Sequence, residues 1–140
     1  MTDAAIFRQQ LTVTDDVVDR NGHVNNVAYV RWMQDIAVAH FKSQISHEQM
    51  DELGCTWVAR SHHIEYLRQA FPDDVIDIET WIADWRRVRS TRKYRFVRRS
   101  DGVTLAQGET DWVLIDMVNG KPRSIPDAVR SVFVLSDGPA

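Results

Sequence analysis

One long amphipathic segment followed by four long β-type segments constrains the fold of this chain more than any other feature. From Asn26 to about Ser43, apolar side chains recur every three or four residues. This period predicts an α-helix of about 18 residues, or about 27 Å. Alternating, β-branched and aromatic sequence then predicts strands over residues 55–67, 75–85, 91–99 and 104–117. Consecutive strands joined by tight turns form antiparallel sheets, and this helix is the only large apolar element available to cover one.

Shorter elements complete the pattern. A first strand is expected over residues 6–13, and a polar loop over 15–25 contains Gly22. Asn25 or Asn26 is a suitable N-cap for the long helix. A capping-box pattern from Ser46 to Gln49 opens a short helix that Gly54 ends, and Pro126 opens another near the C-terminus. In the strand over 55–67, simple alternation predicts two faces, one with Val58, Ile64 and Tyr66 and the other with Trp57, Ala59 and Leu67.

The expected architecture is therefore α+β, with an antiparallel β-sheet wrapped around one long α-helix. We rank it ahead of a cystatin-like or nuclear-transport-factor-like cone. With 140 residues, the chain is expected to form a single domain over residues 1–140. No run of 18 apolar residues predicts a membrane span, and the N-terminus lacks the layout of a signal peptide, so a cytoplasmic location is expected.

Charge is distributed unevenly along the chain. Eight basic residues and no acidic ones lie between Arg86 and Arg99, while the remaining nine basic and 20 acidic residues give −11. The run is interpreted as a solvated edge that discourages aggregation, or as a contact for coenzyme A phosphates or an acidic carrier protein. Arg86, Arg87 and Arg89 are the candidate substrate-binding residues. Nucleic acid ranks last, because no recognised motif accompanies the run and the rest of the chain would repel phosphate.

The loop before the long helix holds the candidate chemistry. Asp19, Asn21 and His23 occupy alternate positions, and in an extended loop such side chains point the same way. The helix start that follows offers unpaired N–H groups to a developing negative charge. A carboxylate with oxyanion-binding amides suits attack on an activated carbonyl. The structural alternative is that Asp, Asn and Gly are common in any turn before a helix.

The segment from Asp19 to Tyr29 resembles the signature of hotdog-fold acyl thioesterases. It is similar to the 4-hydroxybenzoyl-CoA thioesterase family and to plant acyl-ACP thioesterases, which carry Asp-x-Asn-x-His followed by Val-Asn-Asn. The resemblance continues through residues 63–68, 73–74 and 120–126. It implies a hotdog fold, an acyl-CoA or acyl-ACP substrate, and a homodimer or homotetramer with sites between protomers.

The resemblance also implies roles for individual residues. Asp19 matches the catalytic carboxylate, which acts as nucleophile or as general base toward water. Asn21 and His23 match residues that assist it, and the backbone near Asn26 matches the group that polarises the thioester carbonyl. Tyr29 and Glu65 are candidates for substrate binding. No metal or redox cofactor is needed.

Two departures limit the comparison. Gln69 and Ala70 stand where the plant enzymes have Glu-Cys, and Val17 stands where the family often has a first Asp, which places more weight on Asp19. The single cysteine, Cys55, is expected to be packed and inert. On a strand, His63 and Glu65 share a face while His62 points away, and two ligands are too few for a metal site. The alternatives left open are an enoyl-thioester hydratase or dehydratase, and a non-catalytic acyl-thioester binding protein.

Overall fold

The computed structural model describes residues 5–139. Its elements, in chain order, are β1 (Phe7–Thr12), the 3-10 turn η1 (Asp15–Val17), α1 (Asn26–Lys42), α2 (His47–Leu53), β2 (Cys55–Tyr66), β3 (Val75–Ile82), β4 (Arg89–Arg98), β5 (Thr104–Asp116) and α3 (Asp127–Arg130). The sequence predicts every long element, and its largest error is to continue β3 to Trp85, whereas the strand ends at Ile82.

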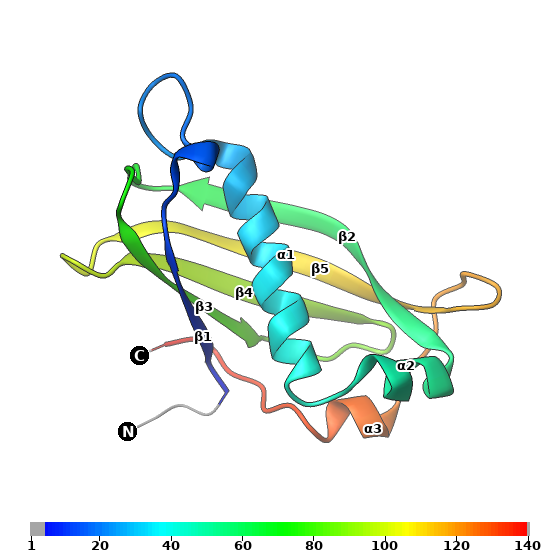
Figure 1. Ribbon diagram of the computed structural model, residues 1–140. Coiled ribbons are helices and arrows are strands. Elements are labelled where there is room, and N and C mark those ends of the chain that lie inside the picture. Colours follow the sequence, from blue (N-terminus) through cyan, green and yellow to red (C-terminus); the bar gives the residue numbers. More distant parts are fainter. Residues whose placement is uncertain (1–4, 140) are drawn as a thin grey trace.

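The strands form one sheet in the order β1-β3-β4-β5-β2, and every neighbouring pair is antiparallel. Helix α1 crosses one face of this sheet, which curves around it (Figure 1). The predicted hotdog architecture, a sheet wrapped around one long helix, is confirmed. Strand β2 lies at one end of the sheet and β1 at the other, so β4 is the central strand.

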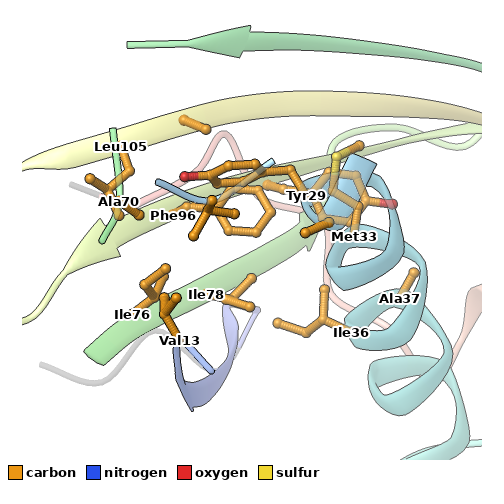
Figure 2. Packing of buried hydrophobic residues seen from close by; sticks show 14 residues of the cluster. Val13, Tyr29, Met33, Ile36, Ala37, Ala70, Ile76, Ile78, Phe96 and Leu105 are labelled. Carbon is orange, nitrogen blue, oxygen red and sulfur yellow. The ribbon is translucent and has the colours of Figure 1, made fainter. Parts of the chain in front are cut away.

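The main core lies between α1 and the sheet (Figure 2). From α1 it takes Tyr29, Met33 and Ile36, which pack on residues of β3 and β4 such as Ile78 and Phe96. A second cluster lies beneath the C-terminal end of α1, where α2 and α3 meet the sheet. Its buried members are Ile45, Met50, Cys55, Ile82, Leu114, Ile125, Val129 and Phe133.

Because Gly108 in β5 has no side chain, Met33 of α1 and the backbone of β2 lie close to β5 at this point. A Cβ atom at this position would lie 2.9 Å from the backbone oxygen of His63 and 3.3 Å from Sδ of Met33. The first distance is shorter than carbon and oxygen atoms tolerate, and the oxygen belongs to a strand backbone that has little freedom to move. The absence of a side chain at Gly108 therefore fixes how tightly the helix and the sheet pack.

Strand β2 contains a bulge between Ala59 and Ser61, where its register against β5 shifts by one residue. The extra residue reverses the alternation of side chains beyond that point. Trp57 and Ala59 therefore share a face with Ile64 and Tyr66, the face toward α1. The prediction that these pairs lie on opposite faces is wrong, because simple alternation takes no account of a bulged residue.

Candidate active site

The loop before α1 is a narrow hairpin rather than an extended segment. Val18 and Val24 form an antiparallel bridge, and the Asp19 N–H donates to the His23 oxygen at 2.9 Å. The Gly22 N–H donates back to the Asp19 oxygen at 3.0 Å, with Gly22 at a φ of +83°. The residues between Asp19 and His23 thus form a tight turn, which corrects the expectation of an extended loop.

The turn brings Asp19 and His23 together. One Asp19 oxygen, Oδ1, accepts the backbone N–H of Asn21 at 2.9 Å, and the other, Oδ2, lies 3.9 Å from Nδ1 of His23. The Asp19 side chain is 31% exposed and that of His23 is 23% exposed, so both are accessible. Asn21 contacts Asp19 through its backbone, and its side chain is exposed.

The base of the hairpin is tied to the start of α1. The Asn25 side chain donates to the Val17 oxygen at 2.9 Å and accepts the Ala28 N–H at 2.9 Å, so Asn25 is the N-cap. Within residues 5–139, the N–H groups of Asn26 and Val27 have no hydrogen-bond acceptor. Both residues are exposed, so these two donors are available to a bound oxyanion.

Tyr29 and Glu65 occupy different surroundings. Tyr29 is buried, with its ring edge-on to those of Tyr66 and Phe96, and burial raises its pKa to about 12. Glu65 lies on the face of the sheet away from α1, where it accepts a hydrogen bond from Gln107 at 3.2 Å. Among residues 5–139, neither side chain hydrogen-bonds to Asp19 or His23.

The basic run lies mostly on β4, the central strand, so the interpretation as a solvated edge is wrong. Arg86 and Arg89 both bind Asp111, and the hydrogen bond from Arg89 lowers the pKa of that carboxyl. Further ion pairs along the run join Arg95 to Glu79, Arg98 to Asp74, and Arg99 to Asp77. Acids that are distant in sequence therefore neutralise most of the charge. Within residues 5–139, Arg87 forms no ion pair and is exposed.

A cavity of about 250 Å³ opens beside the C-terminal half of α1. Its walls come from α1, α2, the sheet and the segment after β3, and they include the aromatic side chains of Phe41, Trp57, Trp85 and Trp112. Arg92 of β4 also lines it. Sequence alone groups Arg92 with the exposed basic residues, although its position two residues before buried Tyr94 indicates an inward side chain.

Arg92 is buried, with 5% of its surface exposed. Its Nη1 contacts Nδ1 of His40 at 2.8 Å and donates to the Thr80 hydroxyl at 3.2 Å. Arginine only donates, so Nδ1 of His40 must accept and the imidazole is neutral. Burial and the neighbouring guanidinium lower the pKa of His40 to about 4, and burial lowers that of Arg92 to about 10. Arg92 therefore remains a buried cation at neutral pH.

Comparison with known proteins places this chain in a family. The family model described as "Thioesterase-like superfamily" matches residues 12–133. The chain belongs to the thioesterase-like superfamily. It is 24% identical over 129 residues to the acyl-CoA thioester hydrolase YbgC of Escherichia coli, covering 91% of this chain and 96% of that relative.

Two further relatives extend the comparison. The chain is 24% identical over 86 residues to oleoyl-acyl carrier protein thioesterase 2 of Arabidopsis thaliana. That match covers 61% of this chain but 23%, under a quarter, of the plant protein. A solved structure of a Staphylococcus aureus protein, SAV2348 in complex with CoA, superposes with a TM-score of 0.85 at 19% identity. It covers 96% of this chain and 89% of that one, which supports the fold.

Cys55 belongs to the second core cluster and is fully buried. Burial raises the pKa of its thiol, which keeps the sulfur protonated and unreactive. Among the described residues 5–139, no helix is both long and apolar enough to cross a bilayer.

Proposed function

We propose that this protein is an acyl-thioester hydrolase with Asp19 as its catalytic carboxylate. The observation that carries the proposal is the Asp19–His23 pair at an accessible turn, tied to a helix start with two N–H groups that lack acceptors among residues 5–139. Membership of the thioesterase-like superfamily over residues 12–133 supports the same chemistry.

In the general-base form of the reaction, Asp19 removes a proton from water as the water oxygen attacks the thioester carbonyl. The N–H groups of Asn26 and Val27 donate to the oxyanion that develops. The intermediate then collapses, the C–S bond breaks, and the thiolate leaves with the proton that Asp19 had taken. In the nucleophilic form, Asp19 attacks the carbonyl itself, the C–S bond breaks, and the thiolate leaves a mixed anhydride with Asp19. Water then hydrolyses this anhydride, which releases the carboxylic acid and restores Asp19, and the thiolate takes up a proton released in that step. Asn21 and His23 orient the carboxylate and the water in both forms.

The active protein is proposed to be a homodimer or a pair of dimers. Within residues 5–139, β2 is paired only on its β5 side, so its other edge presents 12 residues of backbone to solvent. A second copy of β2 running antiparallel would satisfy this edge and continue the sheet. Glu65 and Tyr66 of one subunit would then lie beside the start of β2 in the other.

Coenzyme A or an acyl carrier protein is proposed as the thiol carrier, with Arg87 as its leading contact. Replacing Arg86, Arg87 and Arg89 by Ala is expected to raise KM for a carrier-linked substrate more than it lowers kcat. Such contacts bind the ground state and the transition state alike. The single change Arg87→Ala should give most of this effect, because Arg86 and Arg89 already bind Asp111. An unchanged KM that is also insensitive to salt would contradict this role.

One assay tests the proposed function directly. Purified protein is given a panel of acyl-CoA and acyl-carrier-protein thioesters, and release of free thiol is measured. Turnover of at least one thioester is expected. Hydration of an enoyl-CoA without thiol release would instead identify a hydratase, and binding without any reaction would identify a non-catalytic binding protein.

A further inference from the structure

The aromatic cavity holds a buried cation without a matching anion. Within residues 5–139, no carboxylate lies within ion-pair distance of Arg92, whereas Arg86, Arg89, Arg95, Arg98 and Arg99 each have one. Its partners His40 and Thr80 are neutral and engage only Nη1, so Nε and Nη2 have no acceptor in the described part of the chain. Among the same residues, the buried indole N–H of Trp57, on the cavity wall, also has no acceptor.

We propose that this cavity receives the far end of the acyl group and that Arg92 binds a carboxylate there. The preferred substrates would then be thioesters of dicarboxylic acids rather than of plain fatty acids. This inference rests on the proposed function, because it names the substrate class of that same site.

A carboxylate fits the cavity on three counts. A buried charge without a counter-charge is unfavourable, and a ligand carboxylate supplies the missing charge. The planar guanidinium donates two parallel hydrogen bonds to a carboxylate, which matches its two remaining nitrogens. The walls, formed by Phe41, Trp57 and Trp85, suit a methylene chain leading to that carboxylate. A plain hydrocarbon would fill the same walls but leave the cation unpaired.

The proposed dimer explains how the cavity can serve a reaction at Asp19. Within one chain, the cavity and the Asp19 turn lie toward opposite ends of α1, a helix of 17 residues and about 25 Å. When the faces that point toward α1 are matched, the two-fold pairing of β2 is centred between Arg60 and Ser61, and Trp57 stands opposite the partner subunit's Ile64. Tyr66, on the same face as Ile64, donates to the Asn26 oxygen at 3.0 Å in each chain. In this pairing each cavity would lie toward the start of the other subunit's α1, and the acyl group would span the interface.

The test compares matched thioesters of equal chain length. Adipoyl-, suberoyl- and sebacoyl-CoA are assayed beside hexanoyl-, octanoyl- and decanoyl-CoA, and kcat/KM is measured for each pair. For at least one length, the wild-type protein is expected to favour the dicarboxylic substrate by tenfold or more. In Arg92→Gln this ratio is expected to fall at least tenfold. Lys93→Gln, which removes the neighbouring exposed charge, should leave the ratio unchanged.

The outcomes separate the inference from the function on which it rests. Hydrolysis of the plain thioesters with no preference for a dicarboxylic partner at any length overturns the inference and leaves the proposed function standing. The inference is also overturned if Arg92→Gln keeps the wild-type ratio. If Arg92→Gln fails to fold, as judged by thermal melting, the wild-type ratio and Arg92→Lys decide. The lysine lacks the planar fork and should weaken the preference.

A second measurement needs no turnover. The monoamide of suberic acid, which carries one carboxylate, and octanamide, which carries none, are titrated calorimetrically into the wild-type protein and into Arg92→Gln. The monoamide should bind the wild type at least tenfold more tightly than octanamide, and the variant should lose this difference. That result without hydrolysis of any thioester would refute the proposed function while supporting the cavity as a carboxylate site. Equal binding of the two amides to the wild type would refute the carboxylate role of Arg92.

Discussion

Ionisable side chains in this protein are either partly exposed or buried, and their surroundings differ accordingly. Asp19 is partly exposed and contacts His23, whereas Cys55 is fully buried in an apolar cluster. Arg92 and His40 are buried but form a polar pair beneath α1. Surroundings therefore assign different roles to residues that look equally reactive in the sequence.

Asp19→Asn is expected to keep the fold and the oligomeric state and to lose about 100-fold or more in kcat. The amide has nearly the same size, but it neither accepts a proton from water nor attacks a carbonyl. His23→Ala should lose less, because the imidazole only orients. Thioester turnover is measured beside a thermal melt for each variant.

Cys55→Ala serves as the control for that series, and its turnover should be nearly unchanged. Wild-type turnover in a folded Asp19→Asn would end the carboxylate mechanism. An inactive Cys55→Ala together with an active Asp19→Asn would indicate a thiol nucleophile instead.

His40 predicts a pH-dependent stability. Its pKa is about 4 in the folded protein, against 6.5 for an unperturbed histidine, so between these values the unfolded chain binds a proton that the folded one does not. The stability that the folded protein gains by keeping His40 neutral is fully present above pH 6.5 and is lost as the pH falls toward 4. The loss is about 3 kcal/mol in the free energy of unfolding. His40→Gln should flatten this part of the profile in urea titrations, and equal slopes for both proteins would contradict the assignment.

At the scale of elements, the close contact between α1 and β5 depends on glycine at position 108, which has no side chain. Gly108→Ala should lower the free energy of unfolding by about 1–3 kcal/mol, the usual range for overpacking. The new Cβ would meet the His63 backbone oxygen, at 2.9 Å, as well as Met33. Gln107→Ala, on the opposite face of β5, is the matched control and should change stability by under about 0.5 kcal/mol. Chemical denaturation of both variants makes the comparison, and equal stabilities would refute the close contact.

The elements themselves could be predicted from sequence because their periodicities are strong and their ends carry signals. The Ser46 capping box and the Asn25 cap occur where the pattern indicates them. Alternation alone does not predict the bulge after Ala59, because one extra residue in a polar stretch does not change the pattern of apolar side chains. The sequence predicts that Asp19 and His23 lie close together, but not the tight turn that joins them, which depends on backbone hydrogen bonds around Gly22.

Contacts between residues that are far apart in the sequence explain the other differences between the prediction and the structure. The run from Arg86 to Arg99 looks unopposed in sequence, because its partners, such as Asp111 and Glu79, lie on neighbouring strands. The sequence does not predict the cavity at Arg92 for the same reason, since its walls come from segments far apart in the chain.

At the scale of the whole molecule, the free edge of β2 predicts association. Sedimentation at micromolar concentration should show a dimer or a larger species, because pairing of two β2 edges would satisfy their backbone hydrogen bonds and continue the sheet. Val58→Lys places a charge on this strand, where Val58 is 44% exposed, and should shift the protein toward monomer. Val118→Lys is the matched control, since Val118 is 95% exposed in the turn after β5 and should leave the oligomer intact. A wild-type protein that sediments only as a monomer would exclude the dimer.

The position of β2 also has a consequence for how the chain acquires its structure during synthesis. Strands β3, β4 and β5 follow one another and pair locally, but Tyr66 of β2 pairs with Ala106, and Cys55 pairs with Asp116. At roughly 5–20 residues per second, a ribosome completes β5 seconds after it has completed β2. During that interval β2 lacks its neighbour β5. Strand β1 waits longer still for β3, because Phe7 pairs with Thr80. Both strands at the ends of the sheet, including the one proposed to join two subunits, are therefore unpaired for part of the synthesis of the chain.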